Sequence, residues 1–269
     1  NFFVTGKAGT GKSVLLQRFV GTTAKRVAVV APTGIAAIHV AGQTLHSLLH
    51  MNTDVQKPQN AEEVRRGIGR GTKDLLRALD TLVIDEISMV RVDVMDMLDA
   101  RLRYARGNPL PFGGVQIVAF GDLFQLPPVV GKEPEIEKYL SRRYGTLYFF
   151  GAPAIREHPF AMLELEHVFR QKDPTFLKLL NALRLGRLSD EAFAVLSARV
   201  LPPPREGVIT LTPTNMSAQY VNDLRLRALP TQEHTYTGEI RGTFPPDELP
   251  TDRCLALREG AQVMMLRND

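Results

Sequence analysis

The sequence has a single cysteine, Cys254, among its 269 residues. One cysteine excludes an internal disulfide framework and a zinc site built from cysteines, and it favours a reducing, intracellular compartment. We expect Cys254 itself to be a small buried apolar residue. No run of about 18 apolar residues occurs, so we expect no membrane-spanning helix. Internal repeats and low-complexity tracts are also lacking.

An excess of charge of either sign is nearly lacking too. Lys and Arg number 33 against 29 Asp and Glu, and this net charge of +4 permits a polyanionic partner without requiring one. At 44% hydrophobic residues, the chain has enough apolar side chains for a sizeable core in one large or two ordinary domains. Composition therefore predicts a globular protein.

Short apolar runs alternate with amphipathic segments along the first half of the chain. We expect strands over residues 2–5, 26–33, 82–86 and 115–122, and helices over 13–20, 44–49 and 92–106. This alternation is typical of βαβ units, in which helices cover a parallel sheet. Apolar residues recur at helical spacing over 92–106, and we interpret them as core.

The stretch TGKAGTGKS, residues 5–13, joins the first expected strand to the first expected helix. Its spacing is that of a phosphate-binding loop, in which backbone N–H groups wrap a phosphate at a helix N-terminus. We expect Lys12 to reach the β- and γ-phosphates of a nucleotide and the Ser13 hydroxyl to bind Mg²⁺. The residues expected to contact the nucleotide are Gly6, Ala8, Gly9, Thr10, Gly11, Lys12, Ser13 and Val14.

Polar residues follow two further expected strands. In LVIDEISMV, residues 82–90, Asp85 is expected to hold the metal of a bound nucleotide. Glu86 is placed to polarise a water molecule, which favours ATP hydrolysis over transfer to a small-molecule hydroxyl. In GDLFQLPPV, residues 121–129, we expect Gln125 to hydrogen-bond the γ-phosphate or the attacking water.

A polar stretch interrupts the pattern between Met51 and Leu82. It contains a group of basic residues, which are Arg65, Arg66, Arg70, Lys73 and Arg77. This stretch is either a functional excursion out of the sheet or a solvated surface loop, and composition favours neither over the other. On the expected helix over 92–106, we interpret Arg101, Arg103 and Arg106 as an exposed face rather than as phosphate contacts.

A second α/β region is expected after residues 150–160. A helix over 174–185 closes on Gly186, and another begins after Ser189 as its N-cap. An expected strand over 208–215, VITLTPTN, then leads into a helix from Met216 to about Leu229. One such unit is too little sheet for a finished domain, so we expect this region to be incomplete.

Several motifs together resemble the Pif family of superfamily-one, RecD-like DNA helicases. They are TGKAGTGKS, APTGIAAIHVAGQTLHSLL, LVIDEISMV, PFGGVQIV running into GDLFQLPPV, and VFRQKDP. The resemblance covers nearly the whole chain. It implies an α/β fold with a RecA-like P-loop NTPase sheet flanked by helices over 1–155, and the start of a second RecA-like motor domain over 156–269. The basic stretch, about 49–75, falls where the family inserts a small wedge that splits the duplex.

The resemblance also implies roles for single residues. It agrees with ATP and Mg²⁺ contacts for Lys12, Ser13, Asp85, Glu86 and Gln125. It adds Arg170, which in such helicases reaches from the second motor domain to the γ-phosphate as an arginine finger. It assigns the DNA path to Pro32, Thr33, Thr44, Leu45 and His46, with Thr33 on a phosphate and His46 on a nucleotide. A purely structural His46 is the alternative.

Later motifs of the family, and the adenine-contacting segment ahead of the phosphate loop, do not occur in residues 1–269. We therefore expect the chain to be an excerpt of a longer helicase.

Residues and resemblance together predict an ATP- and Mg²⁺-dependent helicase that moves 5′ to 3′ on single-stranded DNA and acts at single-/double-strand junctions. We expect a monomeric, intracellular motor in genome maintenance, including DNA repair, recombination, replication and telomere maintenance. A nucleotide-gated single-stranded DNA-binding fragment without turnover is one alternative. A P-loop phosphotransferase is the other, and Glu86, Gln125 and Arg170 argue against it.

Overall fold

The computed structural model describes residues 1–269 apart from 53, 57–60, 131–133, 201–207, 241–250 and 266–269. The chain forms two compact units, Asn1–Leu188 and Ser189–Asp269. Within the described part of the chain, no helix combines the length and the apolar character needed to cross a bilayer.

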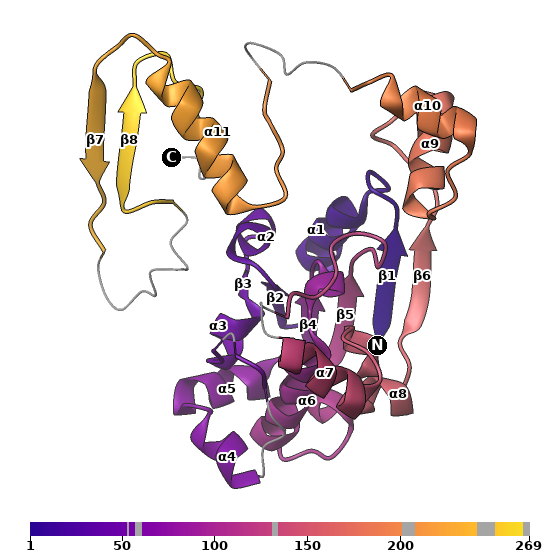
Figure 1. The fold of residues 1–269 in the computed structure, drawn as a ribbon. Coiled ribbons are helices and arrows are strands. Elements are labelled where there is room, and N and C mark those ends of the chain that lie inside the picture. The colour runs from indigo at the N-terminus through magenta and orange to yellow at the C-terminus, as the bar shows by residue number, and fades with distance from the viewer. Residues whose placement is uncertain (53, 57–60, 131–133, 201–207, 241–250, 266–269) are drawn as a thin grey trace. The chain divides into compact units, whose positions relative to one another are not determined.

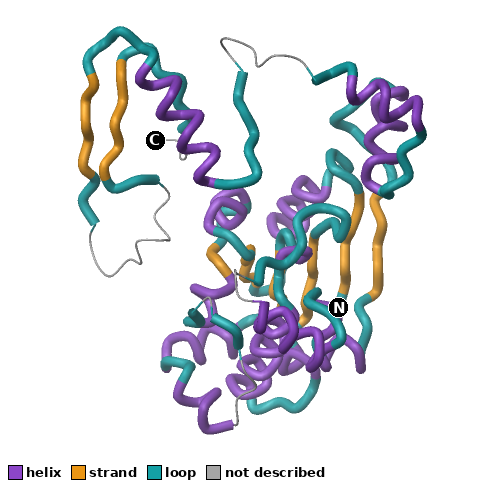
Figure 2. Tube along the Cα trace, viewed as in Figure 1, coloured by secondary structure: helices purple, strands orange, loops and turns teal. Residues whose placement is uncertain are grey.

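The first unit is built on one six-stranded parallel sheet with the strand order β3-β2-β4-β5-β1-β6 (Figures 1 and 2). Its strands are β1 (Phe2–Gly6), β2 (Val27–Ala31), β3 (Gln43–Thr44), β4 (Thr81–Ile84), β5 (Gln116–Phe120) and β6 (Ala161–Leu165). The predicted parallel α/β sheet is confirmed. Because all strands run the same way, the loops that follow them meet at one edge, which we name the C-terminal edge.

Helices lie between and after these strands in the chain. They are α1 (Lys12–Thr22), α2 (Gly34–His39), α3 (Leu45–Leu49), α4 (Ala61–Arg66), α5 (Arg70–Ala78), α6 (Val92–Arg106), α7 (Pro134–Tyr144), α8 (Pro153–Glu157) and α9 (Pro174–Arg184). Short 3₁₀ turns are η1 (Ile87–Met89), η2 (Pro111–Gly114) and η3 (Phe149–Gly151). The predicted helix over 92–106 coincides with α6, which ends where Gly107 adopts a left-handed conformation.

Successive residues of the central strands enter different cores, because side chains alternate across a strand. In β4, Leu82 and Ile84 pack in the larger core together with Leu98 of α6. Val83, between them, packs in the smaller core with Leu16 of α1. The strand is therefore apolar at consecutive positions, as parallel strands with helices on both faces are.

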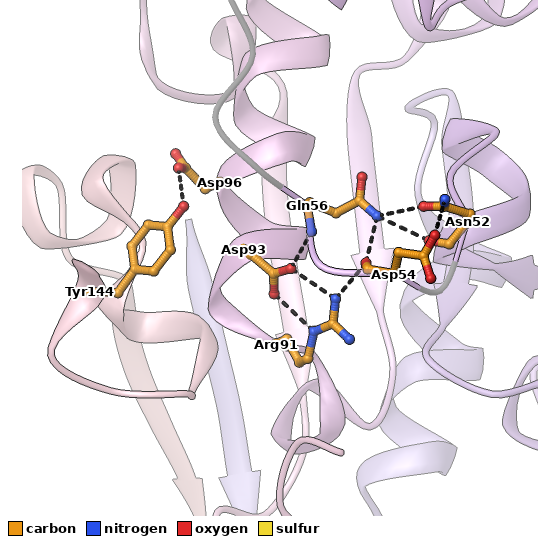
Figure 3. Close-up of polar contacts among 7 residues, drawn as sticks. All are labelled: Asn52, Asp54, Gln56, Arg91, Asp93, Asp96 and Tyr144. Atoms are coloured by element: carbon orange, nitrogen blue, oxygen red, sulfur yellow. Dashed lines mark hydrogen bonds and ion pairs between the residues drawn. The ribbon is translucent and has the colours of Figure 1, made fainter. Parts of the chain in front are cut away.

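The basic stretch between α3 and β4 forms α4 and α5, which pack against α6. Ile68 and Leu76 of this stretch are buried. At its root, the Asp93 carboxylate at the start of α6 accepts a hydrogen bond from the Gln56 N–H at 2.7 Å and two from Arg91 at 2.8 and 2.9 Å (Figure 3). The described part of the stretch is therefore a packed helical excursion rather than a solvated loop, and its role as a wedge stays a prediction.

The arginines of α6 do not form an exposed face. Arg101 is only 3% exposed, and Arg103 pairs with Asp99 at 2.8 Å. Arg106 donates a 2.8 Å hydrogen bond to the Gly113 carbonyl oxygen. The expectation of a solvated face is wrong, because loops pack over this side of the helix and periodicity within one helix does not report what covers it.

The second unit contains α10 (Asp190–Ser197), α11 (Asn215–Arg227) and the antiparallel pair β7 (Glu233–Thr237) and β8 (Cys254–Arg258). The Ser189 hydroxyl caps α10 by accepting from the Ala192 N–H at 3.2 Å, which confirms the predicted N-cap. Cys254 is exposed, so its expected burial is wrong. An antiparallel pair with every residue of β7 exposed offers no interior for the thiol.

The strand predicted over 208–215 is also wrong. Residues 208–214 are irregular, and α11 begins directly after them at Asn215. Ile209 and Leu211 are 69% and 93% exposed. An apolar run becomes a strand only where a neighbouring strand accepts its hydrogen bonds, and none of the described strands pairs with this run.

The compact units divide after Leu188, whereas the sequence predicted a boundary at 155. The difference arises because β6 extends the first sheet beside β1, with Phe2 opposite Ala161 and Gly6 opposite Leu165. The start of a second motor domain over 156–269 stays a prediction.

Candidate active site

The loop after β1 has the backbone of a phosphate cradle. Gly9 and Gly11 have φ angles of 79° and 89°, which residues with a Cβ rarely adopt. A Cβ on Gly6 would lie 2.6 Å from the Leu165 carbonyl oxygen and 2.7 Å from the Thr10 hydroxyl oxygen, closer than atoms can approach. Because Gly11 is the N-cap of α1, the free N–H groups of that helix open onto the loop.

The Lys12 side chain lies over this loop. Its Nζ donates hydrogen bonds to the Gly6 carbonyl oxygen at 2.6 Å and to the Lys7 carbonyl oxygen at 3.2 Å. Burial lowers the pKa of Lys12, while the charges of Asp122, Glu86 and Asp85 act to raise it. These carboxylates are therefore close enough to Lys12 to affect its protonation. The phosphate loop and the segments 82–90 and 121–129 thus lie near one another.

Asp85 and Glu86 follow β4 at the C-terminal edge. Asp85 is 8% exposed, and its Oδ1 accepts a hydrogen bond from the Glu86 N–H at 3.0 Å. Burial raises the pKa of both carboxyls, and the neighbouring Asp85 charge raises the pKa of Glu86 further. Glu86 has a φ of 49°, a left-handed conformation that directs the chain sharply into η1.

Gln125 lies in the loop after β5, the strand between β4 and β1. Its side-chain Nε2 donates to Asp122 Oδ2 at 3.0 Å. Sequence reasoning missed Asp122, although an acidic residue soon after a buried strand was the same signal that identified Asp85. Asp122 is 1% exposed and acts on the pKa of both Lys12 and Glu86.

The segment that contains Arg170 packs directly on the phosphate loop. The Phe169 N–H donates to the Gly9 carbonyl oxygen at 2.8 Å. A Cβ on Gly9 would lie 2.6 Å from the Cβ of Arg170. The structure thus places Arg170 within the first compact unit, beside the loop, whereas the resemblance implied an origin in the second motor domain. No pattern within either segment indicated this contact.

The residues assigned to the DNA path lie at or just after the ends of β2 and β3, which pair with each other. The Thr33 and Thr44 hydroxyls cap α2 and α3 by accepting from backbone N–H groups at 3.3 and 3.1 Å. Each hydroxyl still has its own O–H to donate. Leu45 is 1% exposed and belongs to the core, so its side chain cannot contact DNA and only its backbone can. Pro32 and His46 are half-buried.

The two groups of predicted residues occupy different stretches of the same edge. Those for the nucleotide follow the adjacent strands β4, β5 and β1, while those for DNA follow β3 and β2. Ligands of open parallel sheets bind at this edge. One edge therefore carries a candidate phosphate site and, next to it, the two hydroxyl groups of Thr33 and Thr44.

The residues present fit a nucleotide with Mg²⁺. A Cβ on Gly6 or Gly9 would collide with neighbouring residues, so the loop can keep its shape only with glycine at these positions. Magnesium takes oxygen ligands, usually one or two carboxylates together with substrate phosphates. The Ser13 hydroxyl at the start of α1 and the Asp85 carboxylate supply such oxygens on the two sides of the loop after β5.

Three comparisons relate the chain to known proteins. ATP-dependent DNA helicase PIF1 of Saccharomyces cerevisiae is 35% identical over 286 residues, which cover 100% of this chain and 32% of the relative. Crystal structures of Bacteroides Pif1 in complex with ADP-AlF4 and bound to single-stranded DNA are 37% and 36% identical, with TM-scores of 0.85 and 0.82. Each match covers 100% of this chain and 62% of that structure.

The chain thus spans about a third of the length of the yeast relative that it matches. The family model described as PIF1-like helicase matches residues 1–193, which contain the phosphate loop, both carboxylates after β4, Gln125 and Arg170. The chain therefore belongs to the PIF1-like helicase family.

Proposed function

We propose that the protein is an ATP-dependent DNA helicase that moves 5′ to 3′ along single-stranded DNA. The observation that carries this proposal is the glycine cradle after β1, with Lys12 hydrogen-bonded across it, at the same edge of the sheet as Asp85 and Glu86 after β4. The S. cerevisiae relative is named an ATP-dependent DNA helicase, and the Bacteroides relative has been crystallised with ADP-AlF4 and with single-stranded DNA.

The chain's own residues divide the work of hydrolysis. The cradle N–H groups and Lys12 hold the phosphates, and Ser13 and Asp85 hold Mg²⁺, which when bound draws charge from the phosphate oxygens. Glu86 orients the attacking water and accepts its proton. Glu86 suits this role because its carboxylate directly follows Asp85 at the C-terminal edge of the sheet.

Two further residues act on the γ-phosphate. Gln125 contacts the attacking water or the γ-phosphate, and Arg170 stabilises the charge that develops during transfer. The contact of Phe169 with the Gly9 carbonyl supports this assignment, since it keeps the Arg170 segment on the loop. Gly6, Ala8, Thr10, Gly11 and Val14 complete the contacts proposed for the nucleotide.

DNA binds along the row formed by Pro32, Thr33, Thr44, the Leu45 backbone and His46. Hydroxyl and backbone donors to phosphates carry no sequence preference, which suits a motor that must travel over any sequence. The excursion of α4 and α5 acts as the wedge at a single-/double-strand junction. We assign the protein to an intracellular compartment and to genome maintenance, as a monomeric motor whose second domain begins in residues 156–269.

Steady-state ATP hydrolysis by the full-length protein tests this proposal, with and without a single-stranded oligonucleotide. We expect strong stimulation by DNA, and a loss of turnover of about 100-fold or more in Lys12→Ala. The matched control is Lys25→Ala, which removes an exposed lysine just before β2, on the opposite edge of the sheet. It should leave turnover unchanged.

Two results would overturn the proposal. Turnover that ignores DNA would favour the phosphotransferase alternative, and DNA binding without turnover would favour the nucleotide-gated binding module. Polarity is tested with duplexes that carry only a 5′ or only a 3′ single-stranded tail. Unwinding of the 3′-tailed substrate alone would contradict 5′-to-3′ movement.

A further inference from the structure

Each oxygen of the Asp122 carboxylate accepts two hydrogen bonds. Oδ1 accepts from Arg184 Nη2 at 2.7 Å and from the Phe124 N–H at 3.1 Å. Oδ2 accepts from Gln125 Nε2 at 3.0 Å and from Arg184 Nε at 3.3 Å. Asp122 therefore joins the loop after β5 to the last residue of α9, which lies 62 positions later in the chain.

Arg184 makes two kinds of contact with the loop after β5. Its guanidinium presents two neighbouring N–H groups to the two oxygens of Asp122, a planar fork that is stronger and more directional than a single contact. The same guanidinium lies over the Phe124 ring, 4.2 Å from its centroid. The side chains of Arg184 and Asp122 are 18% and 1% exposed, so water screens the pair little.

The contact with Asp122 decides which end of the Gln125 amide faces the carboxylate. An ionised carboxylate only accepts hydrogen bonds, so it takes the NH₂ group and turns the amide Oε1 away. Burial alone would raise the pKa of Asp122, but hydrogen bonds from Arg184 and Gln125 outweigh it and hold the pKa below its ordinary value. Asp122 thus stays an acceptor, and the amide keeps one orientation.

We propose that Arg184 is a positioning residue for ATP hydrolysis, which acts through Asp122 to hold the Gln125 amide in one orientation with Oε1 as an acceptor for the attacking water. This inference rests on the proposed function. Arg184 itself does not contact the reacting atoms, because its fork is engaged by Asp122. It links α9 to a loop in which Phe124, Gln125 and Leu126 are exposed.

The test is a double-mutant cycle in the full-length protein, read as DNA-stimulated kcat and as KM for ATP. Arg184→Met should lower kcat about 10- to 100-fold and change KM less than about threefold, since it removes an interaction that matters in the transition state. Adding Arg184→Met to Gln125→Ala should cost nothing further, because the residue it positions is already gone. Arg184→Lys should restore part of kcat, since it keeps the charge but not the fork.

Arg187→Met is the matched control, because it removes an exposed arginine three positions after Arg184 and should leave kcat unchanged. The melting temperature of each variant separates a folding defect from a catalytic one. If Arg184→Met lowers it, Asp122→Asn carries the test: an amide at this position can donate as well as accept, so the orientation of Gln125 is no longer set, and kcat should fall while folding is kept.

Three results would overturn the inference. Multiplicative effects in the double mutant would show that Arg184 does not act through Gln125. A rise in KM with unchanged kcat would point to a direct contact with ATP in the ground state, and a kcat equal to that of Arg187→Met would show no role. Absence of DNA-stimulated turnover in the unsubstituted protein would overturn the proposed function as well, so the two failures are distinguishable.

Discussion

The two compact units differ in how their helices are held. In the first, α6 buries ten of its residues, among them Met95, Leu98 and Leu102. In the second, neither α10 nor α11 buries a residue, although both begin with well-formed side-chain caps at Ser189 and Thr214. A side-chain cap is enough to set the residue at which a helix begins. Burial of apolar side chains supplies most of the free energy that keeps the helix folded.

Burial of side chains changes at one point along the chain. Every buried side chain in the described part of the chain lies at or before Ile155. Apolar residues after that point, such as Leu211 and Met216, are 93% and 83% exposed. The helix α9 of the first unit also buries no residue, so the change from helices specified by packing to helices specified by local hydrogen bonds comes after Ile155, within the first unit.

Removing Asp93 should have the largest effect on stability. The Asp93→Ala substitution leaves Arg91 without the carboxylate that accepts its bonds and the Gln56 N–H without an acceptor (Figure 3). We expect a loss of about 3–5 kcal/mol in the free energy of unfolding, measured by urea denaturation followed by circular dichroism. Asp223→Ala on α11 removes a carboxylate that accepts from exposed Gln219, and it should change the free energy of unfolding by less than about 0.5 kcal/mol. Equal losses in the free energy of unfolding for Asp93→Ala and Asp223→Ala would contradict the difference between the two units.

Truncation of a leucine tests the core itself. Leu98 on α6 is 0% exposed, and Leu98→Ala should cost about 2–5 kcal/mol because it leaves a cavity. Leu224 on α11 is 52% exposed, and Leu224→Ala should cost less than about 0.5 kcal/mol. The same denaturation experiment compares them, and a large loss in Leu224→Ala would reveal packing in the second unit.

The caps should behave alike in both units, which sharpens the comparison. Asp173 caps α9 in the first unit through the Thr175 and Phe176 N–H groups, and Ser189 caps α10 in the second. Asp173→Ala and Ser189→Ala should each destabilise their own helix by about 1 kcal/mol. Hydrogen exchange of the α9 and α10 amides measures both. Loss of protection spreading into β4 would mean that these helices are not independent local units.

Local patterns in the sequence predicted much of the first unit. The strands β1, β2, β4 and β5 and the helices α1, α3 and α6 follow from apolar periodicity, and the cradle follows from glycine spacing, because both depend on residues that are near one another in the chain. The helices α2, α4 and α5 were not predicted. The packing of Phe169 on Gly9 and the pairing of Arg184 with Asp122 join segments far apart in sequence. No local pattern reports such contacts, which also explains the errors at Arg101 and over 208–215.

The pairing of β1 between β5 and β6 has a consequence for how the protein is made. Phe2 lies opposite Val118 on one side and opposite Ala161 on the other. At about 5–20 residues per second, a ribosome needs roughly 8–30 s to extend the chain from β1 to β6. During that time the strand that carries the phosphate loop lacks at least one of its two neighbours, and until β5 is made it lacks both, so a nascent-chain chaperone or the ribosome surface has an opportunity to bind at β1.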